Sequence, residues 1–544
     1  MIRTRVFDDR RGVWAFALGC VAVVIGVLLH IPMFMMGANM GFKLAGMPMD
    51  PGMIFGMFAI VAGVFVAAYG LLPPKIVEHL QASSRVAVTA PEDLKLGPAH
   101  WGLMGVLVVA LVIDVMKPAS LGFTVPGLIK EYGVTKQQAS LVPFFALIGT
   151  ATGSVLWGIL ADLYGRKASI LLSAVVFVGT SICGAMPSLE WNIGMCFLMG
   201  MGAGGMLPVT YALLAEIMPS KHRGWALVLV GGLGAVGGYF AASGASYLLV
   251  PHWSWRVLWL LNLPTGLTLI AMGGLMPESA KFLLSRGRSD EAHKVMARFG
   301  TTSHQLRANE EDVDDVFVHH HADHTGHEPK LWTPGLIGKT AALTIGALSW
   351  GLINFGLLLW MPNELVNKGY SMAVSSKLLA QSALIAFPTV FLCSFLYSRW
   401  STKWALVTTI AVTFLGLVGV WMLEAHMLAS PVLPIALLII GTNGIVAIIL
   451  PYASESYPLQ FRGRATGWIA ACTKGGGVFA QFLTVAALVP ALGIHAPPMG
   501  LAAALIMIPI LLTLVLFIKY GTETRGLDLR SLERPAAKKA AAKA

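Results

Sequence analysis

Long apolar runs alternate with short polar segments along this chain of 544 residues. A helix needs about 20 apolar residues to cross the hydrocarbon core of a bilayer. We count fourteen such runs and expect each to form a membrane-spanning helix. The expected spans are Trp14–Met35, Ile54–Leu72, Leu103–Leu121, Leu141–Leu160, Ala168–Met186, Ile193–Ile217, Trp225–Leu249, Val257–Leu275, Ala342–Met361, Leu379–Tyr397, Trp404–Met422, Val432–Ala453, Trp468–Leu488 and Leu501–Phe517.

The longer polar segments divide these spans into a leading pair and two groups of six. The sequence therefore predicts an all-α integral membrane protein, with a two-helix hairpin preceding a twelve-helix core. The expected units are the N-terminal hairpin (1–72), a cytoplasmic linker (73–101), the first six-helix half (102–276), a hydrophilic cytoplasmic central loop (277–339), the second six-helix half (340–519) and a basic cytoplasmic tail (520–544).

The composition agrees with a protein that crosses a membrane many times. Hydrophobic residues make up 56% of the chain and charged residues 12%, which excludes an ordinary soluble domain. The net charge of +11 raises the question of nucleic acid binding. The basic residues, however, follow the positive-inside rule, so we expect no nucleic acid partner and place both termini in the cytoplasm. The basic pairs that define this side are Arg166 and Lys167, Lys221 and Arg223, Arg399 and Lys403, and Arg462 and Arg464.

The first apolar run follows a cluster of arginines and is longer than the core of a signal peptide. We interpret it as a membrane anchor and expect a bacterial inner membrane protein. The cysteines all lie inside apolar runs, so no disulfide framework is expected.

A charged loop, Gly-Ile-Leu-Ala-Asp-Leu-Tyr-Gly-Arg-Lys, joins two of the expected spans at residues 158–167. A carboxylate is unfavourable at a helix C-terminus, so Asp162 needs a partner outside its own helix. Arg166 and Lys167 suit both such a contact and the cytoplasmic face. We expect this loop to act as a conformational latch, with Gly158, Asp162, Gly165, Arg166 and Lys167 as its functional residues.

The two halves share an internal repeat. Glu216-x2-Pro-x3-Arg223-Gly recurs as Glu455-x2-Pro-x3-Arg462-Gly, and each copy lies at the end of the fourth expected span of its half. Two halves repeated in parallel are the build of many transporters that bind substrate between the halves. We expect these four charged residues to form gating salt bridges.

The loop and the repeat together resemble the major facilitator superfamily of secondary transporters. Further segments resemble its metabolite–proton symporter and sugar-porter branches, over roughly residues 102 to 529. These segments are Gly200–Gly205 with Pro208, Trp253–Arg256, Pro277–Leu284 and Glu523–Gly526. The resemblance implies a twelve-helix core, a substrate site between the halves and transport by alternating access.

The first core helix departs from the family pattern in its charges. Where relatives often carry two acids, this chain has Asp114 and Lys117, while the arginine usual in the fourth helix is replaced by Cys196. Asp114 and Lys117 are three residues apart and so share one helix face. Ionisable residues inside a span are costly and usually functional. We expect Asp114 to take the coupling proton, with Lys117 either binding an anionic substrate or setting the proton affinity of Asp114. The alternative is a mutually neutralised structural pair.

Other polar residues inside spans are weaker candidates for contacts with substrate or proton. Lys474 either contacts substrate, extends to the interface, or pairs with an acid. Asn354, Gln381 and Asn443 are candidates for substrate contact, although hydrogen bonding between helices is an alternative role for each.

Two segments resemble metal-binding sequences. A histidine-rich tract at residues 319–327 lies in the central loop, and methionines flank the outer loop of the hairpin after His30. We expect the tract to be a solvated loop and the methionines to serve packing, so the sequence predicts neither a metal site nor a cofactor. Copper handling remains a minor alternative.

Taken together, these features predict a monomeric transporter rather than an enzyme. We expect alternating-access transport of a small organic, anionic metabolite, coupled to protons across the lipid bilayer. The alternatives are a drug or metabolite exporter of the same fold, or a non-transporting membrane sensor or assembly protein.

Overall fold

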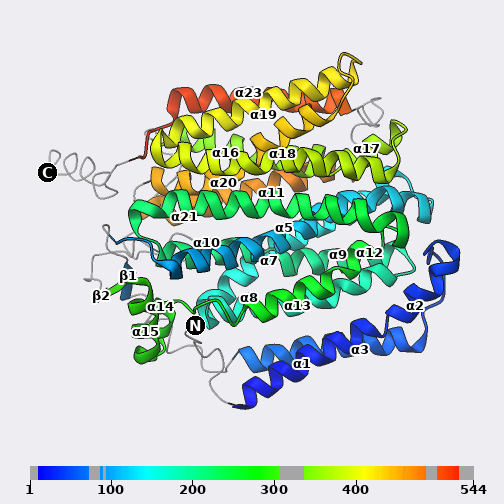
Figure 1. Ribbon diagram of the computed structural model, residues 1–544, viewed down its shortest axis with the longest axis horizontal. Helices are drawn as coiled ribbons and strands as arrows, with labels where there is room; N and C mark the ends of the chain where they lie inside the picture. Colours follow the sequence, from blue (N-terminus) through cyan, green and yellow to red (C-terminus); the bar gives the residue numbers. More distant parts are fainter. Residues whose placement is uncertain are drawn as a thin grey trace.

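The computed structural model describes residues 10–72, 86–89, 94–305, 336–457, 459–485 and 499–525. These residues form a bundle of long helices that run roughly side by side (Figure 1). Within this part of the chain, eleven helical segments are long and apolar enough to cross a membrane. They confirm a polytopic, all-helical membrane fold, and they account for eleven of the fourteen expected spans.

The remaining three expected spans take other forms. The span expected at Ile193–Ile217 is broken into two helices, α9 (Leu189–Ala203) and α10 (Met206–Ile217). The span at Val257–Leu275 consists of the short helices α12 (Val257–Leu260) and α13 (Asn262–Met272). The span at Trp468–Leu488 falls largely within α21 (Leu459–Val485).

The first half is built from α5 to α13. Its other elements are α5 (Pro98–Tyr132), α6 (Lys136–Ala139), α7 (Leu141–Tyr164), α8 (Arg166–Gly179), the 3₁₀ turn η2 (Thr180–Ala185) and α11 (Ser220–Trp253). Helices α7 and α9 approach backbone to backbone, because a side chain at Gly200 or Gly204 would clash with carbonyl oxygens of α7. Gly200 and Gly204 therefore permit close packing of the two helices.

The second half is built from α16 to α23. Its elements are α16 (Ile337–Gly351), the π-helical turn η3 (Leu352–Leu358), α17 (Met361–Asn367), α18 (Met372–Arg399), α19 (Thr402–Glu424), α20 (Val432–Ser456), α21 and α23 (Met499–Tyr520). Side-chain caps set several helix starts. Ser371 accepts a hydrogen bond from the Val374 amide at 3.2 Å, and Ser401 accepts one from the Trp404 amide at 3.0 Å.

The two halves meet along α11, α18 and α20, and again where α7 approaches α21. In Figure 1 the green α11 runs through the middle of the bundle between the two groups of helices. The hydroxyls of Ser246 and Ser376 lie 2.8 Å apart across this contact. The arrangement leaves a cavity between the halves, described below.

The N-terminal segment forms a helical hairpin that packs against the first half. It consists of α1 (Arg10–Leu28), α2 (Ile31–Met36), the 3₁₀ turn η1 (Gly37–Met40) and α3 (Pro51–Leu71). Each long helix carries glycines seven residues apart, and they face one another as Gly12 with Gly70, Gly19 with Gly63, and Gly26 with Gly56. A Cβ at Gly19 would lie 2.5 Å from the Gly63 carbonyl oxygen, so the close approach of the helices depends on glycine. This glycine repeat was visible in the sequence, but the close approach of the two helices was not predicted from it.

The hairpin joins the first half through an apolar face and a polar anchor. Val23 and Ile60 belong to a buried cluster with residues of α8. At the other end, Glu131 of α5 accepts hydrogen bonds from the amide of Leu44, in the hairpin loop, and from the Trp255 indole. The fully buried Arg256 pairs with the same carboxylate at 2.7 Å. The hairpin is thus attached to α5 and to the start of the sixth core span.

The linker and the central loop contain structure that the sequence did not predict. Strand β1 (Val86–Thr89) pairs antiparallel with β2 (Thr302–Gln305), with Val86 opposite Gln305. Two short helices, α14 (Ala280–Ser285) and α15 (Ser289–Phe299), precede β2. In Figure 1 they lie beside the strands at one end of the bundle. The histidine-rich tract lies outside the described residues.

Candidate transport site

A cavity of about 1230 Å³ lies between the two halves. Its walls come from α5, α7 and α11 on one side and from α16, η3, α20 and α21 on the other. The cavity reaches the exposed side chains of Ile159, near the end of α7, and Trp468, near the start of α21. It therefore opens toward the end of the bundle that the basic loops predict to be cytoplasmic.

The opposite end of the cavity is closed by contacts between the halves. The rings of Phe144 and Phe482 lie 6.4 Å apart, and Gly122 of α5 packs directly against the Leu359 carbonyl. Two polar contacts lie further along the same end: Lys136 pairs with Glu364 at 2.7 Å, and the Gln137 amide donates to the Val485 carbonyl at 2.8 Å. This conformation is open on the predicted cytoplasmic side and closed on the other. The sequence had not predicted a closing role for these residues.

Asp114 lines the cavity, whereas Lys117 does not. The Lys117 ammonium lies 3.9 Å from the Asp114 carboxylate and 3.1 Å from the centroid of the Phe177 ring of α8. Lys117 is almost fully buried, and the ring provides a cation–π contact. Lys117 therefore faces Asp114 and the Phe177 ring rather than the cavity.

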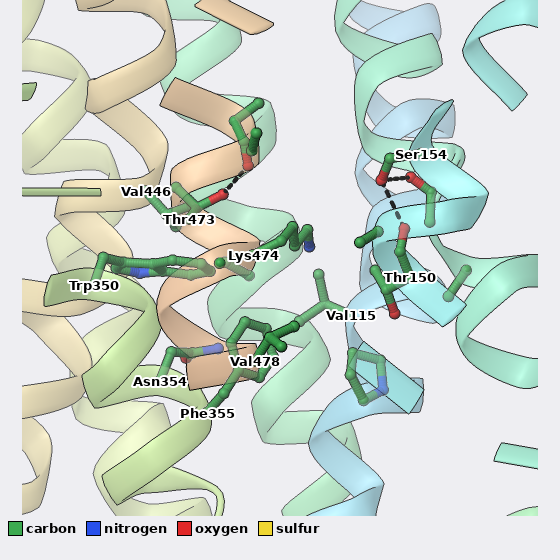
Figure 2. A pocket seen from close by; sticks show the side chains of 18 of the residues that line it. Val115, Thr150, Ser154, Trp350, Asn354, Phe355, Val446, Thr473, Lys474 and Val478 are labelled. Carbon is green, nitrogen blue, oxygen red and sulfur yellow. Dashed lines mark hydrogen bonds between the residues drawn. The ribbon is translucent and has the colours of Figure 1, made fainter. Parts of the chain in front are cut away.

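Lys474 is the cation that faces the cavity. It extends from α21 toward the wall that carries Val115, Thr150 and Ser154 (Figure 2). Among the described residues its ammonium makes no hydrogen bond or ion pair, and Asp114 lines the same cavity. Its Nζ atom lies 5.8 Å from the Phe355 ring. An unpaired ammonium in a membrane-embedded cavity is suited to bind an anion.

The structure places two of the three uncharged candidates at the cavity and the third away from it. Asn354 and Asn443 line the cavity, whereas Gln381 lies on an exposed face of α18 away from it. Sequence reasoning missed Tyr239, which lines the cavity and whose hydroxyl has no hydrogen-bond partner among the described residues. Aliphatic side chains form most of the remaining wall, together with several aromatic rings that include Trp350.

The expected latch residues gather at the junction of α7 and α8. Gly165 has a φ of +98°, and a Cβ there would lie 2.6 Å from a carboxylate oxygen of Glu278. The Glu278 carboxylate accepts hydrogen bonds from the Arg166 amide at 2.9 Å and from the Lys167 amide, so it caps the start of α8. Burial raises the pKa of Glu278, and these amide donors oppose that rise.

The Arg166 guanidinium also reaches the end of α10, where it lies 3.3 Å from Glu216. Both residues belong to the first half, so this contact joins helices within one half and does not bridge the halves. Gly158 faces the cavity. The side chain of Asp162 lies outside what the structure describes.

The second half has a corresponding but different set of contacts. Glu455 accepts hydrogen bonds from the Tyr397 hydroxyl at 2.6 Å and from the Thr524 hydroxyl at 3.0 Å. A Cβ at Gly224, which follows Arg223 in the first half, would lie 2.6 Å from Glu455 Oε1. Glu455 is therefore close to the partner half. The side chain of Arg462 is outside the described part of the chain.

A second carboxylate cap lies at the start of α19. Glu523 accepts hydrogen bonds from the Thr402 amide at 3.0 Å and its hydroxyl at 2.7 Å. It has the same role there that Glu278 has at α8. A carboxylate thus caps a helix start in both halves, in addition to the sequence motif that the halves share.

Comparison with known protein families shows to which family the chain belongs. The family model described as Major Facilitator Superfamily matches residues 103–481, which is more than half of the chain. The chain belongs to the Major Facilitator Superfamily. This membership confirms the resemblance seen in the sequence and makes the protein a membrane transporter of small metabolites. The matched region begins after the N-terminal hairpin.

Curated relatives cover most of the chain. The niacin transporter NiaP of Acinetobacter baylyi is 25% identical over 453 residues, covering 82% of this chain and 99% of the relative. The 4-hydroxybenzoate transporter PcaK of Pseudomonas aeruginosa is 27% identical over 413 residues, covering 71% and 86%. The benzoate transport protein of A. baylyi is 23% identical over 407 residues, covering 72% and 84%.

Among solved structures, the proton:xylose symporter XylE bound to 6-bromo-6-deoxy-D-glucose superposes with a TM-score of 0.63. The identity is 16%, and the match covers 80% of this chain and 98% of that chain. This similarity establishes a shared fold.

Within the described residues, no group of three or more His, Cys, Asp and Glu side chains is arranged to hold a metal ion. His30 is buried in the hairpin and its Nδ1 lies 2.7 Å from the Gly26 carbonyl oxygen.

Proposed function

We propose that this protein transports small aromatic carboxylates together with protons. The observation that carries the proposal is the unpaired ammonium of Lys474, which faces an apolar cavity that also contains aromatic rings and the carboxylate of Asp114. The names of three relatives point the same way, because niacin, benzoate and 4-hydroxybenzoate are all aromatic carboxylates. Their rings match the rings of Trp350 and Phe355, and their charge matches Lys474.

The charges of the site suggest how substrate and proton are coupled. With Asp114 ionised, Lys117 and Lys474 leave one unbalanced positive charge in the middle of the bundle. A substrate carboxylate on Lys474 neutralises that charge and competes with Asp114 for the lysine. Asp114 then loses part of its electrostatic stabilisation and binds a proton more readily. Substrate binding thereby favours proton binding, as symport requires.

The buried Lys117 prevents the proton affinity of Asp114 from rising too far. Its ammonium lies 3.9 Å from Asp114 and outside the cavity, where a bound substrate would not displace it. Asp114 therefore keeps one favourable partner and releases its proton again on the cytoplasmic side. Asn354, Asn443 and Tyr239 supply hydrogen bonds that orient the substrate ring.

Alternating access in this proposal uses the two ends of the bundle. The contacts of Lys136 with Glu364 and of Phe144 with Phe482 hold the outer end closed in the conformation described here. When they separate, the halves close at the cytoplasmic end, where Gly158, Glu216, Arg223, Glu455 and the 158–167 loop act as gating elements. Asp162 belongs to this loop, and Arg462 completes the set by its place in the repeat.

For the membrane topology we propose fourteen crossings, with both termini in the cytoplasm of a bacterial cell and the protein acting as a monomer in the inner membrane. The eleven long apolar helices supply most of the crossings, and α9–α10, α12–α13 and α21 supply the other three. The hairpin, the linker, the two halves, the central loop and the tail keep the boundaries predicted from the sequence. Reporter fusions at 90, 320 and 535 should all report cytoplasm.

The transport proposal is tested with purified protein in liposomes carrying an imposed pH gradient, acid outside. Labelled nicotinate, benzoate and 4-hydroxybenzoate should accumulate, whereas nicotinamide and xylose should not. An outward-directed gradient should drive efflux of preloaded carboxylate, since the gradient sets the direction. Uptake of none of the carboxylates above that of empty liposomes would refute the substrate class.

A further inference from the structure

The cavity wall contains an irregular element, the π-helical turn η3 (Leu352–Leu358). It carries two cavity residues, Asn354 and Phe355, and lies between the regular helices α16 and α17. A π-helical turn is wider than an α-helical one and is frequent at functional sites. Inside a membrane the backbone polar groups of such a turn need protein partners, because lipid offers none.

Gln481 of α21 supplies a partner from behind the cavity wall. Its side chain is fully buried, and its amide nitrogen donates a hydrogen bond to the Phe355 carbonyl. Its carbonyl oxygen accepts a hydrogen bond from the Trp360 indole at 3.3 Å. The side chains of Phe479 and Phe482, on the same helix, line the cavity, whereas Gln481 does not. Gln481 thus fastens the turn without occupying substrate space.

The same part of α21 also fixes Lys474 relative to the turn. Glycines allow α21 and α16 to touch directly: a Cβ at Gly477 would lie 2.5 Å from the Phe355 ring, and one at Gly351 would lie 2.7 Å from the Gly477 amide nitrogen. The Phe355 ring in turn lies 5.8 Å from the Lys474 ammonium. A shift of the Phe355 backbone would therefore shift the ring that lies beside the Lys474 ammonium.

Trp360 extends these contacts to the other half. The ammonium of Lys136 lies 4.9 Å from the Trp360 ring and 2.7 Å from Glu364. Lys136 belongs to the first half, and the other two residues belong to the second. The chain of contacts from Phe355 through Gln481 and Trp360 therefore runs from the cavity wall to the closed outer end.

We propose that Gln481 is a positioning residue of the transport site. It holds the π-helical turn so that Asn354 and Phe355 face the cavity, and it joins that turn through Trp360 to the contact made by Lys136. The inference rests on the proposed transport function, but its first test needs no substrate.

The first test measures the orientation of Asn354 directly. Asn354→Cys places a thiol on the turn, and its alkylation by a membrane-permeant maleimide is measured as the excess over the parent protein. Adding Gln481→Leu removes both hydrogen bonds and should change the alkylation rate at least about fivefold, since a buried donor and acceptor lose their partners. Ser154→Cys, on the opposite wall, should react at the same rate with and without Gln481→Leu.

Thr513→Val is the matched control for loss of a buried hydrogen bond. The Thr513 hydroxyl is fully buried and donates to the Pro509 carbonyl at 2.7 Å within α23, away from the cavity. Adding this change should leave the reactivity of Cys at position 354 as it is. An equal response to Gln481→Leu and Thr513→Val would mean that Gln481 has a general structural role, and would overturn the proposal.

The second test measures transport kinetics with labelled nicotinate. Gln481→Leu should raise KM about tenfold while changing the maximal rate less, because the substrate contacts are misplaced before the transport step. Trp360→Phe keeps the ring beside Lys136 but removes the indole N–H, and should give a smaller rise in KM; this variant decides the question if Gln481→Leu does not fold. Wild-type KM in both variants would refute the proposal, whereas failure of the wild-type protein to carry nicotinate would refute the proposed substrate and leave the thiol test decisive.

Discussion

The Lys117 ammonium lies 3.9 Å from the Asp114 carboxylate, and of the two residues Asp114 alone lines the cavity. One residue of the pair therefore lines the cavity, and the other is buried against the Phe177 ring. This asymmetry leads us to propose different roles for the two lysines near Asp114. In the proposal Lys117 adjusts the proton affinity of Asp114, and Lys474 binds the anion.

Asp114→Asn should abolish accumulation of substrate driven by a pH gradient, because the side chain no longer binds and releases a proton. Exchange of external for internal substrate should continue, since Lys474 and the aromatic walls remain. Both are measured in the same liposomes with labelled benzoate. Full uphill accumulation by the variant would exclude Asp114 as the proton site.

Lys117→Met should move the pH dependence of uptake to higher pH. A unit charge 3.9 Å away contributes about 4 kcal/mol at an effective dielectric constant of about 20, which is an upper bound for a pair with Lys474 nearby. We expect the half-maximal pH to rise by at least about one unit, with less than about a threefold change in KM at the optimum. Lys117→Arg is the matched control, because it retains the charge. An unchanged pH profile with a large rise in KM would mean that Lys117 contacts substrate.

Lys474→Met should weaken binding of carboxylates by about 10- to 100-fold, the effect of losing one hydrogen bond to a charged group. Lys474→Arg should retain most of the affinity, because the guanidinium also binds carboxylates. Affinity is measured by competition with labelled nicotinate at fixed pH. Equal affinity in the wild-type and Met variants would contradict an anion site at Lys474.

Glu364→Gln should favour the outward-open state, because it removes the ion pair that joins the halves at the closed end. Both side chains are partly exposed, so the effect is about two- to fivefold. An impermeant maleimide added outside should label Asn354→Cys faster in this background. The exchange Lys136→Glu with Glu364→Lys restores opposite charges and should return the rate toward wild type; a rate that stays high would argue against a role for the ion pair.

Gly19→Ala should destabilise the hairpin by about 1–3 kcal/mol, since its methyl group would meet the Gly63 carbonyl oxygen at 2.5 Å. Gly102→Ala is the matched control, because nothing lies within 4 Å of its Cβ position and alanine favours a helix. Thermal unfolding in detergent compares the two. Equal melting temperatures would show that α1 and α3 do not need the close approach seen here.

The sequence predicted the parts of the fold that depend on local pattern. The apolar runs placed most spans within a few residues of the helices in the structure. The break in the fourth span at Gly204 and Gly205 was not predicted, because a helix break inside an apolar run leaves the hydrophobic pattern intact. The β1–β2 pair joins segments about 200 residues apart, and no local signal marks such a contact.

The candidate site was predicted in part for the same reason. Asp114 and Lys474 were identifiable because a charge within a span is costly. Which lysine faces the cavity depended on the rotation of α5 and α21, which apolar runs do not determine. Gln381 and Gln481 are both glutamines within apolar segments, yet one is exposed on α18 and the other fully buried behind the cavity. Tertiary packing alone distinguishes them.

The most direct test of the central claim is the flux of labelled nicotinate into liposomes that contain the purified protein, recorded with and without an imposed pH gradient, acid outside. The account predicts accumulation above the external concentration that scales with the gradient, collapses when a protonophore is added, and is competed by benzoate but not by nicotinamide. Saturable uptake that does not depend on the pH gradient would contradict this account. So would stronger competition by nicotinamide than by benzoate.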